Sequence, residues 1–210
     1  MNHETEKPLR ALIVMATNPH NDESIRNQKP ISNAWVIQHQ ERLQKTVEVC
    51  AVENPSYLIF VGGERFTYNG ETTTEAEYIR SCFLEILKTK ATENQPQILI
   101  ANTYMETFKQ IEETVGLLSK LGLTHGILGI ISSWHQTPRI QLIFKMETNF
   151  TTKTYVANKP ELKPRFISDM WNFVAGYGYT FLLLLMKKGG HWNSGGPIID
   201  WFTKKRQIRK

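Results

Sequence analysis

Two stretches of the chain carry side chains that could bind or transform a small molecule. The first places Gly62 and Gly63 ahead of Glu75, and the second, Ser132–Arg139, holds two serines, a histidine and an arginine. Glycines let a ligand approach backbone amides, a carboxylate accepts hydrogen bonds from hydroxyl or amine groups, and a guanidinium binds phosphate or carboxylate. These residue types indicate a site for a small ligand with an anionic end.

Each charged residue of this set also has an ordinary structural explanation. Glu75 follows three threonines, Thr72–Thr74, at the start of a predicted helix, where hydroxyls cap the helix and a carboxylate complements its dipole. Arg139 falls in the first turn of another predicted helix, where it could form a surface salt bridge. The sequence leaves a binding role and a structural role open for both residues.

Catalysis would need a base near the substrate, and Glu75 and His135 are the two candidates. A serine near a histidine suggests a serine hydrolase, but the segment Ile131–Gln136 lacks the GxSxG turn that exposes such a nucleophile. The chain also lacks GxGxxG and P-loop motifs. No cysteine and histidine cluster predicts a metal site. A transferase or a phosphate-ester hydrolase therefore stays an alternative to simple binding.

Apolar runs typical of buried strands alternate with segments whose apolar residues have helical spacing. The expected strands are Ala11–Ala16, Tyr57–Val61, Gln97–Ala101, Gly126–Ile131 and Phe150–Val156, the last an edge strand. The expected helices are Asn33–Val52, Thr74–Lys90, Met105–Leu121 and Pro138–Met146. Such units form right-handed crossovers, which predicts an α/β fold: a three-layer Rossmann-like sandwich with a mainly parallel sheet of about five strands. The polar loops then meet at the carboxyl edge of the sheet.

The predicted domain organisation is a single Rossmann-like domain, residues 1–160, with residues 161–210 as a C-terminal helical extension and basic tail packed on it. Much of the net charge of +5 lies in that tail, which indicates a solvated terminus rather than a specific nucleic-acid surface. No apolar run is long enough to cross a bilayer, and no secretory segment is evident. We expect a cytoplasmic protein, with the aromatic C-terminal region as a candidate homodimer or partner surface.

The order of these motifs resembles the domain of unknown function 218 family, the YdcF/SanA/ElyC-like group of bacterial proteins. The resemblance runs from about Leu9 to Tyr155 and rests on an apolar first strand, Arg42 in a helix, the glycine pair and Thr74-Glu75-Ala76. A threonine of the family aligns on Thr107. The closing signature aligns on Ser132–Arg139, with Gln136 in the register of the family's histidine and His135 one place earlier.

The resemblance implies a Rossmann-like fold and a ligand site at the carboxyl edge of the sheet. One member of the family is reported to bind S-adenosylmethionine, which makes that molecule the expected cofactor here. Envelope members usually carry a membrane anchor, so the resemblance favours the YdcF-like branch. The implied ligand-binding residues are Gly62, Gly63, Glu75, Thr107, Ser132, Ser133 and Arg139. A non-enzymatic interaction module remains a further alternative.

Overall fold

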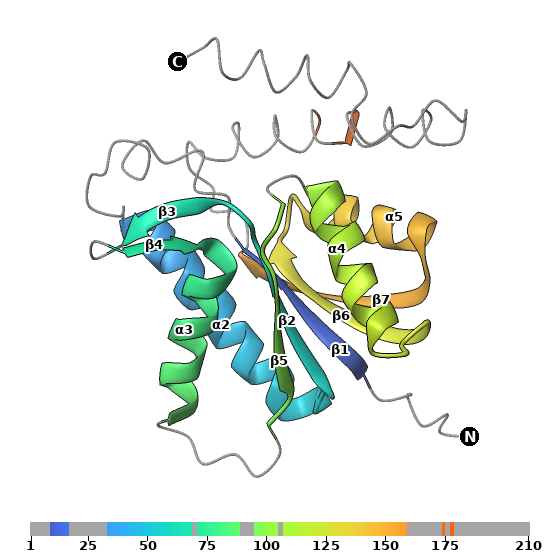
Figure 1. The fold of residues 1–210 in the computed structure, drawn as a ribbon, viewed down its shortest axis with the longest axis horizontal. Helices are drawn as coiled ribbons and strands as arrows, with labels where there is room; N and C mark the ends of the chain where they lie inside the picture. The colour runs from blue at the N-terminus through green and yellow to red at the C-terminus, as the bar shows by residue number, and fades with distance from the viewer. Residues whose placement is uncertain are drawn as a thin grey trace.

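A five-stranded sheet, in which every neighbouring pair of strands is parallel, forms the centre of the protein (Figure 1). The structure is a computed structural model that describes residues 9–16, 33–68, 71–88, 95–104, 107–158, 174 and 177–178. The strands of the sheet are β1 (Leu9–Met15), β2 (Tyr57–Val61), β5 (Gln97–Ala101), β6 (His125–Ser133) and β7 (Asn149–Asn158). Their order in the sheet is β5-β2-β1-β6-β7.

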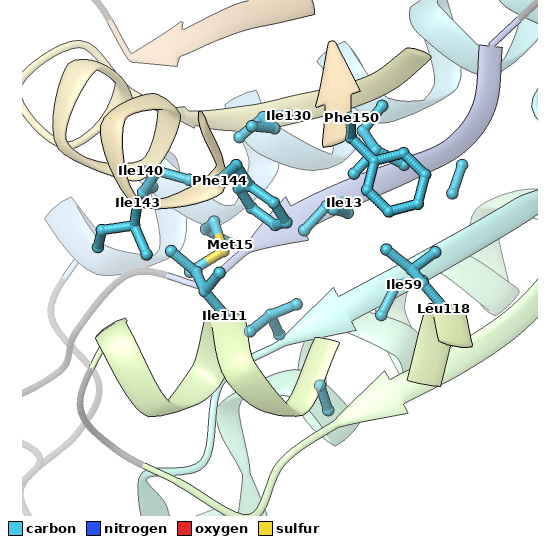
Figure 2. Packing of buried hydrophobic residues seen from close by; sticks show 14 of the residues in the cluster. Ile13, Met15, Ile59, Ile111, Leu118, Ile130, Ile140, Ile143, Phe144 and Phe150 are labelled. Atoms are coloured by element: carbon cyan, nitrogen blue, oxygen red, sulfur yellow. The ribbon is translucent and has the colours of Figure 1, made fainter. Parts of the chain in front are cut away.

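Helices cover both faces of this sheet, as Figure 1 shows. The helices are α2 (Asn33–Glu53), α3 (Glu75–Lys88), α4 (Thr107–Lys120) and α5 (Thr137–Glu147). Buried side chains of α2 and α3 pack on one face, and those of α4 and α5 pack on the other (Figure 2). The predicted three-layer Rossmann-like α/β sandwich with a parallel sheet of five strands is therefore confirmed.

The first strand shows why its sequence is continuously apolar. Ala11, Ile13 and Met15 contribute to the core under α4 and α5, whereas Leu12 and Val14 contribute to the core under α2 and α3. A strand buried on both faces reads as an unbroken apolar run, because neither set of alternate side chains meets water. This double burial fixes the carboxyl end of β1 in the middle of the sheet.

The order of the strands places a topological switch point between β1 and β6. The chain moves from β1 through β2 to β5 on one side, then returns to β6 beside β1 and continues to β7. Ligands of open α/β sheets bind in the crevice outside the carboxyl ends of the strands at such a point. The carboxyl ends of β1 and β6 are thus the expected position of a site.

A short antiparallel hairpin, which was not among the expected strands, connects the glycine pair after β2 to α3. It consists of β3 (Arg65–Tyr68) and β4 (Glu71–Thr74), with Tyr68 opposite Glu71. Phe66 of β3 is buried and contacts the ring of Tyr78 on α3 edge-on, at 5.8 Å between ring centroids. The hairpin is therefore anchored on the domain by an aromatic contact.

Residues with positive φ mark the ends of two helices, and some of the expected segments lie outside the described residues. Asn54, with a φ of 44°, directly follows α2, and Gly122, with a φ of 72°, lies just after α4; a residue with positive φ commonly ends a helix. The predicted C-terminal extension, residues 161–210, and the polar loop Thr17–Lys29 lie outside the described residues, apart from three positions. Among the helices that the structure describes, none has the length and apolar character needed to cross a membrane.

Candidate functional site

A small polar pocket lies at the carboxyl ends of the central strands. Its volume is about 30 Å³, which is room for one or two water-sized groups, since one water needs roughly 10–15 Å³ on this measure. It joins the end of β1, the foot of the hairpin, the start of α4 and the loop after β6. We call it the strand-end pocket, and its described lining residues are Met15, Ala16, Glu64, Glu75, Thr107, Gln110 and Gln136.

Glu75 is the first residue of α3, yet it does not cap that helix. The Thr74 N–H donates to Glu77 Oε2 at 2.8 Å, and the Glu77 N–H donates to Thr74 Oγ1 at 3.3 Å. This reciprocal pair is a capping box. Glu77 further accepts a hydrogen bond from the Asn102 side-chain amide at 3.1 Å. The needs of the helix terminus are therefore met without the side chain of Glu75, which turns into the strand-end pocket instead.

The Glu75 carboxyl is buried at a cost to stability. Only 3% of the residue is exposed, and its Oε1 accepts no hydrogen bond from any residue that the structure describes. Burial raises the pKa of Glu75 well above its ordinary value, and the charge of Glu64 adds to the rise, while Arg42 opposes it. An unsatisfied buried carboxyl oxygen costs about 1–3 kcal/mol or more. A group held in this state is a candidate for ligand binding or proton transfer.

A fully buried arginine lies beneath the pocket. Arg42, near the middle of α2, has 0% of its surface exposed. It donates to the carbonyl oxygen of Met15 at the end of β1 and to Oγ of Ser133 at the end of β6. Burial lowers the pKa of Arg42 to about 10, against the opposing charges of Glu75 and Glu41. One guanidinium thus ties the two strands of the switch point together beside Glu75.

The two serines after β6 already have protein partners. Ser133 Oγ accepts the hydrogen bond from Arg42, and Ser132 Oγ donates to Gln136 Oε1 at 3.2 Å. Through these contacts Ser133 holds the arginine, and Ser132 positions a side chain that lines the pocket. Both serines are buried. Neither serine is among the described lining residues of the pocket.

The glycine pair after β2 is explained by close packing. A Cβ at Gly62 would lie 2.9 Å from Oε2 of Glu75, and one at Gly63 would overlap the backbone of Tyr104. The Gly62 N–H donates to the Ala101 carbonyl at 3.0 Å and so extends the pairing of β2 with β5. Gly62 therefore makes room for the buried carboxyl, and its amide is engaged within the protein.

The remaining predicted site residues lie at the same edge of the sheet but at different depths. Thr107 begins α4 and lines the strand-end pocket with Glu75. His135 stands in the turn after β6, where its ring meets that of Trp134 edge-on at 5.8 Å. Arg139 lies in the first turn of α5. The described lining of the pocket includes neither His135 nor Arg139.

Three pocket residues are absent from the predicted ligand-binding residues, although Gln136 aligns on the family's histidine. Glu64 directly follows the glycine pair, Gln110 lies one turn into α4, and Gln136 precedes α5. Gln110 donates to the Tyr104 carbonyl at 3.0 Å. Glutamine and glutamate in loops and helix starts are common on surfaces, so their types gave no signal. Arg42, which lies beside the pocket, entered the sequence analysis only through the family resemblance.

A larger hollow of about 350 Å³ lies on the outer side of α2 and α3. Among its described lining residues, the acidic Glu48 pairs with Lys45 at 2.5 Å on the same helix. None of the described residues that line this hollow forms a reactive group, so we place the candidate site at the smaller strand-end pocket. The described residues lining the hollow are Gln40, Leu43, Gln44, Val47, Glu48 and Ile86.

Within the described part of the chain, no group of three or more histidine, cysteine, aspartate or glutamate side chains is arranged to hold a metal ion. The strand-end pocket offers two carboxylates, two amides and a hydroxyl, which suit hydrogen-bonding groups of an organic ligand. Comparison with family models, with curated proteins and with solved structures finds no match to this chain in any of the three.

Proposed function

We propose that this protein is a YdcF-like member of the domain of unknown function 218 family that binds a small anionic or nucleoside-containing ligand at the carboxyl edge of its sheet. S-adenosylmethionine is the first candidate ligand. Arg139 and the serines of the β6 loop would stand near the anionic end, and Glu75 would meet hydroxyl or amine groups. Thr107 would lie beside them.

One observation carries the proposal: Glu75 lines the strand-end pocket, and Oε1 of its buried carboxyl accepts no hydrogen bond from the described residues. The pocket sits at the switch point between β1 and β6, the usual ligand position in such folds. Capping does not account for the carboxylate, because Thr74 and Glu77 perform it. A ligand donor would supply the missing hydrogen bond.

The size of the pocket limits how the ligand lies. A volume of about 30 Å³ accepts one small polar group, far less than the roughly 300–1,000 Å³ of a site that encloses a whole ligand. The pocket therefore serves as the end of a binding site, and the rest of the ligand extends over the loops that surround it.

An enzymatic role, as a transferase or a phosphate-ester hydrolase, is the second candidate. Its support is the raised pKa of Glu75, which favours a protonated carboxyl that can act as a general acid. A pH–rate profile that loses one limb in Glu75→Gln would support this role. Absence of turnover across a panel of nucleotide and sugar phosphates would count against it.

Calorimetry with S-adenosylmethionine, nucleotides and sugar phosphates tests the binding proposal. We expect saturable binding and a melting temperature that rises with ligand concentration, because a ligand of the native state stabilises it. Arg139→Ala should cost about 1.5–3 kcal/mol of binding free energy, a loss of roughly 10–150-fold in affinity. Glu71→Gln, an exposed carboxylate on the hairpin, is the matched control. Unchanged affinity in Arg139→Ala would remove that residue from the site.

We also propose a cytoplasmic location in a bacterial cell and self-association into a homodimer, both of which follow from the resemblance and from the aromatic C-terminal sequence. Cell fractionation tests the location. For the dimer, truncation after Lys188 should leave a folded monomer, as measured by light scattering. Aggregation of the truncated chain would instead assign the region to the core.

A further inference from the structure

A second carboxylate, Glu64, reaches the strand-end pocket beside Glu75. Glu64 immediately precedes β3 and Glu75 immediately follows β4, so the two residues stand at the foot of the hairpin. The Glu75 N–H donates to the Glu64 carbonyl oxygen at 3.1 Å. Both side chains line the pocket. The hairpin therefore brings two carboxyl groups to one small polar space.

No hydrogen bond among the described residues requires a carboxylate at position 75, whose only described stabilising charge is that of the buried Arg42. Thr74 and Glu77 cap α3, and Arg42 directs hydrogen bonds to Met15 and Ser133. Glu75 Oε1 stays buried and accepts no hydrogen bond from the described residues. Stability would favour a neutral side chain here, because a buried charge without a hydrogen-bonding partner is costly. The position therefore indicates a donor supplied by a ligand.

We propose that the strand-end pocket binds a protonated primary amine of the ligand between Glu64 and Glu75. The inference rests on the proposed function, because it names the ligand group that enters the same pocket. An ammonium group has three N–H donors, so it supplies the hydrogen bond that Glu75 Oε1 lacks. Its positive charge offsets the repulsion between the two carboxylates. Its size suits a volume of about 30 Å³.

The two carboxyl groups that line the pocket disfavour an anionic group or a hydroxyl of the ligand in the same position. An anion would meet two carboxylates at short range, and the low polarity of a buried site strengthens that repulsion. A hydroxyl donates one hydrogen bond and leaves the repulsion in place. The anionic end of the ligand then lies outside this pocket, nearer the start of α5.

An NMR titration of the full chain tests the inference with three simple probes. Methylammonium chloride is the test ligand. Methanol is the neutral control of similar size, and tetramethylammonium chloride is the control cation without N–H donors. At constant ionic strength, methylammonium should shift the backbone amide signals of Gly62 and Ala76 saturably, and the other two should not. Glu64→Gln and Glu75→Gln should each weaken its binding about tenfold or more, as expected for one charge-assisted hydrogen bond. Glu71→Gln should leave binding unchanged.

Equal shifts with methanol or tetramethylammonium would overturn the inference, as would unchanged methylammonium binding in both Gln variants. If Glu64→Gln loses its fold, which its amide spectrum reports, Glu64→Asp replaces it and should weaken binding while keeping the charge. A different result would reject the proposed function without rejecting the amine site. Methylammonium binding without binding of S-adenosylmethionine or any nucleotide keeps the amine site and rejects that function, and the reverse pattern rejects the amine site alone.

Discussion

Thr74 and Glu77 close the first turn of α3 with reciprocal hydrogen bonds, at 2.8 Å from the Thr74 N–H to Glu77 Oε2 and at 3.3 Å from the Glu77 N–H to Thr74 Oγ1. The pair explains why the chain has two glutamates in this turn. Glu77 satisfies the helix, whereas Glu75 enters the strand-end pocket. Two residues of one type, two positions apart, thus have separate structural roles.

Loss of the cap should weaken the protein by a modest and measurable amount. Removing an N-cap hydroxyl costs about 0.5–2 kcal/mol, so Thr74→Ala should lower the free energy of unfolding by that much in urea titrations. Glu77→Ala should lose a similar amount. Glu85→Ala is the control, since Glu85 forms an exposed pair with Lys88 on the same helix and such pairs contribute little. Equal losses of unfolding free energy in Glu77→Ala and Glu85→Ala would contradict the capping role of Glu77.

The strands and helices of the domain could be predicted because their burial leaves a clear pattern. The run Ala11–Ala16 is apolar throughout, since β1 is covered on both faces. α3 carries Ala76, Ile79 and Phe83 on its buried side, at helical spacing. From alternating elements of this kind, the parallel sheet and its carboxyl edge follow by the rules of chain handedness.

The hairpin and half of the pocket could not be recognised in this way. β3 and β4 have four residues each, and their threonines and charged residues leave no apolar run. The sequence Asn69-Gly70 between them was a usable signal, since this dipeptide favours two-residue hairpin turns. Glu64 and Gln136 reach the pocket only because the hairpin and the β6 loop bring them there. Their positions depend on tertiary structure, which local patterns do not contain.

The glycine pair after β2 should tolerate no side chain. A Cβ at Gly63 would overlap the Tyr104 backbone, and a Cβ at Gly62 would press on Ala16 and Glu75. Gly63→Ala should therefore destabilise the protein by about 1–3 kcal/mol, the usual cost of overpacking. The measurement is the free energy of unfolding in urea.

Gly116 provides the matched control for this substitution. It lies within α4, and a Cβ at that position would meet no heavy atom within 4 Å. Gly116→Ala should stabilise the protein by about 0.5–1 kcal/mol, because alanine loses less conformational freedom in a helix than glycine does. Stabilisation by Gly63→Ala as well would mean that the packing around Tyr104 differs from the one described.

Arg42 and Glu75 should show coupled effects on stability. Arg42→Met removes a buried cation that hydrogen-bonds Met15 and Ser133 and offsets the charge of Glu75. Breaking such a buried arrangement costs about 3–5 kcal/mol. The loss should be smaller in a Glu75→Gln background, where no carboxylate is left without its cation, with a coupling of about 0.5–3 kcal/mol in a double-mutant cycle.

Two further variants sharpen that cycle. Arg42→Lys keeps the positive charge near Glu75 but loses the planar pattern of donors, so it should reduce stability while retaining part of the coupling. Arg80→Met removes an exposed arginine of α3 and should change the free energy of unfolding by no more than about 0.5 kcal/mol. Strictly additive effects of Arg42→Met and Glu75→Gln would show that the two side chains do not interact.

The pH dependence of stability should report the Glu75 carboxyl directly. Its pKa in the folded protein is raised well above 4.5, chiefly by burial, so the folded state holds a proton that the unfolded state has released. The free energy of unfolding should therefore fall as pH rises from about 4.5 through the raised folded value. Glu53 and Glu77, whose pKa values are lowered by hydrogen bonds, act with the opposite sign and at pH values below that window.

Urea titrations at a series of pH values, compared between the wild type and Glu75→Gln, isolate this contribution. The difference in unfolding free energy between the two proteins should change steadily across the window, by about 1.4 kcal/mol for each pH unit in which only the folded state is protonated. Glu71→Gln, which removes an exposed carboxylate of the hairpin, should leave the wild-type slope intact. A slope that survives in Glu75→Gln would assign the proton to another group and would remove the main argument for a buried, ligand-accepting carboxyl at the end of the sheet.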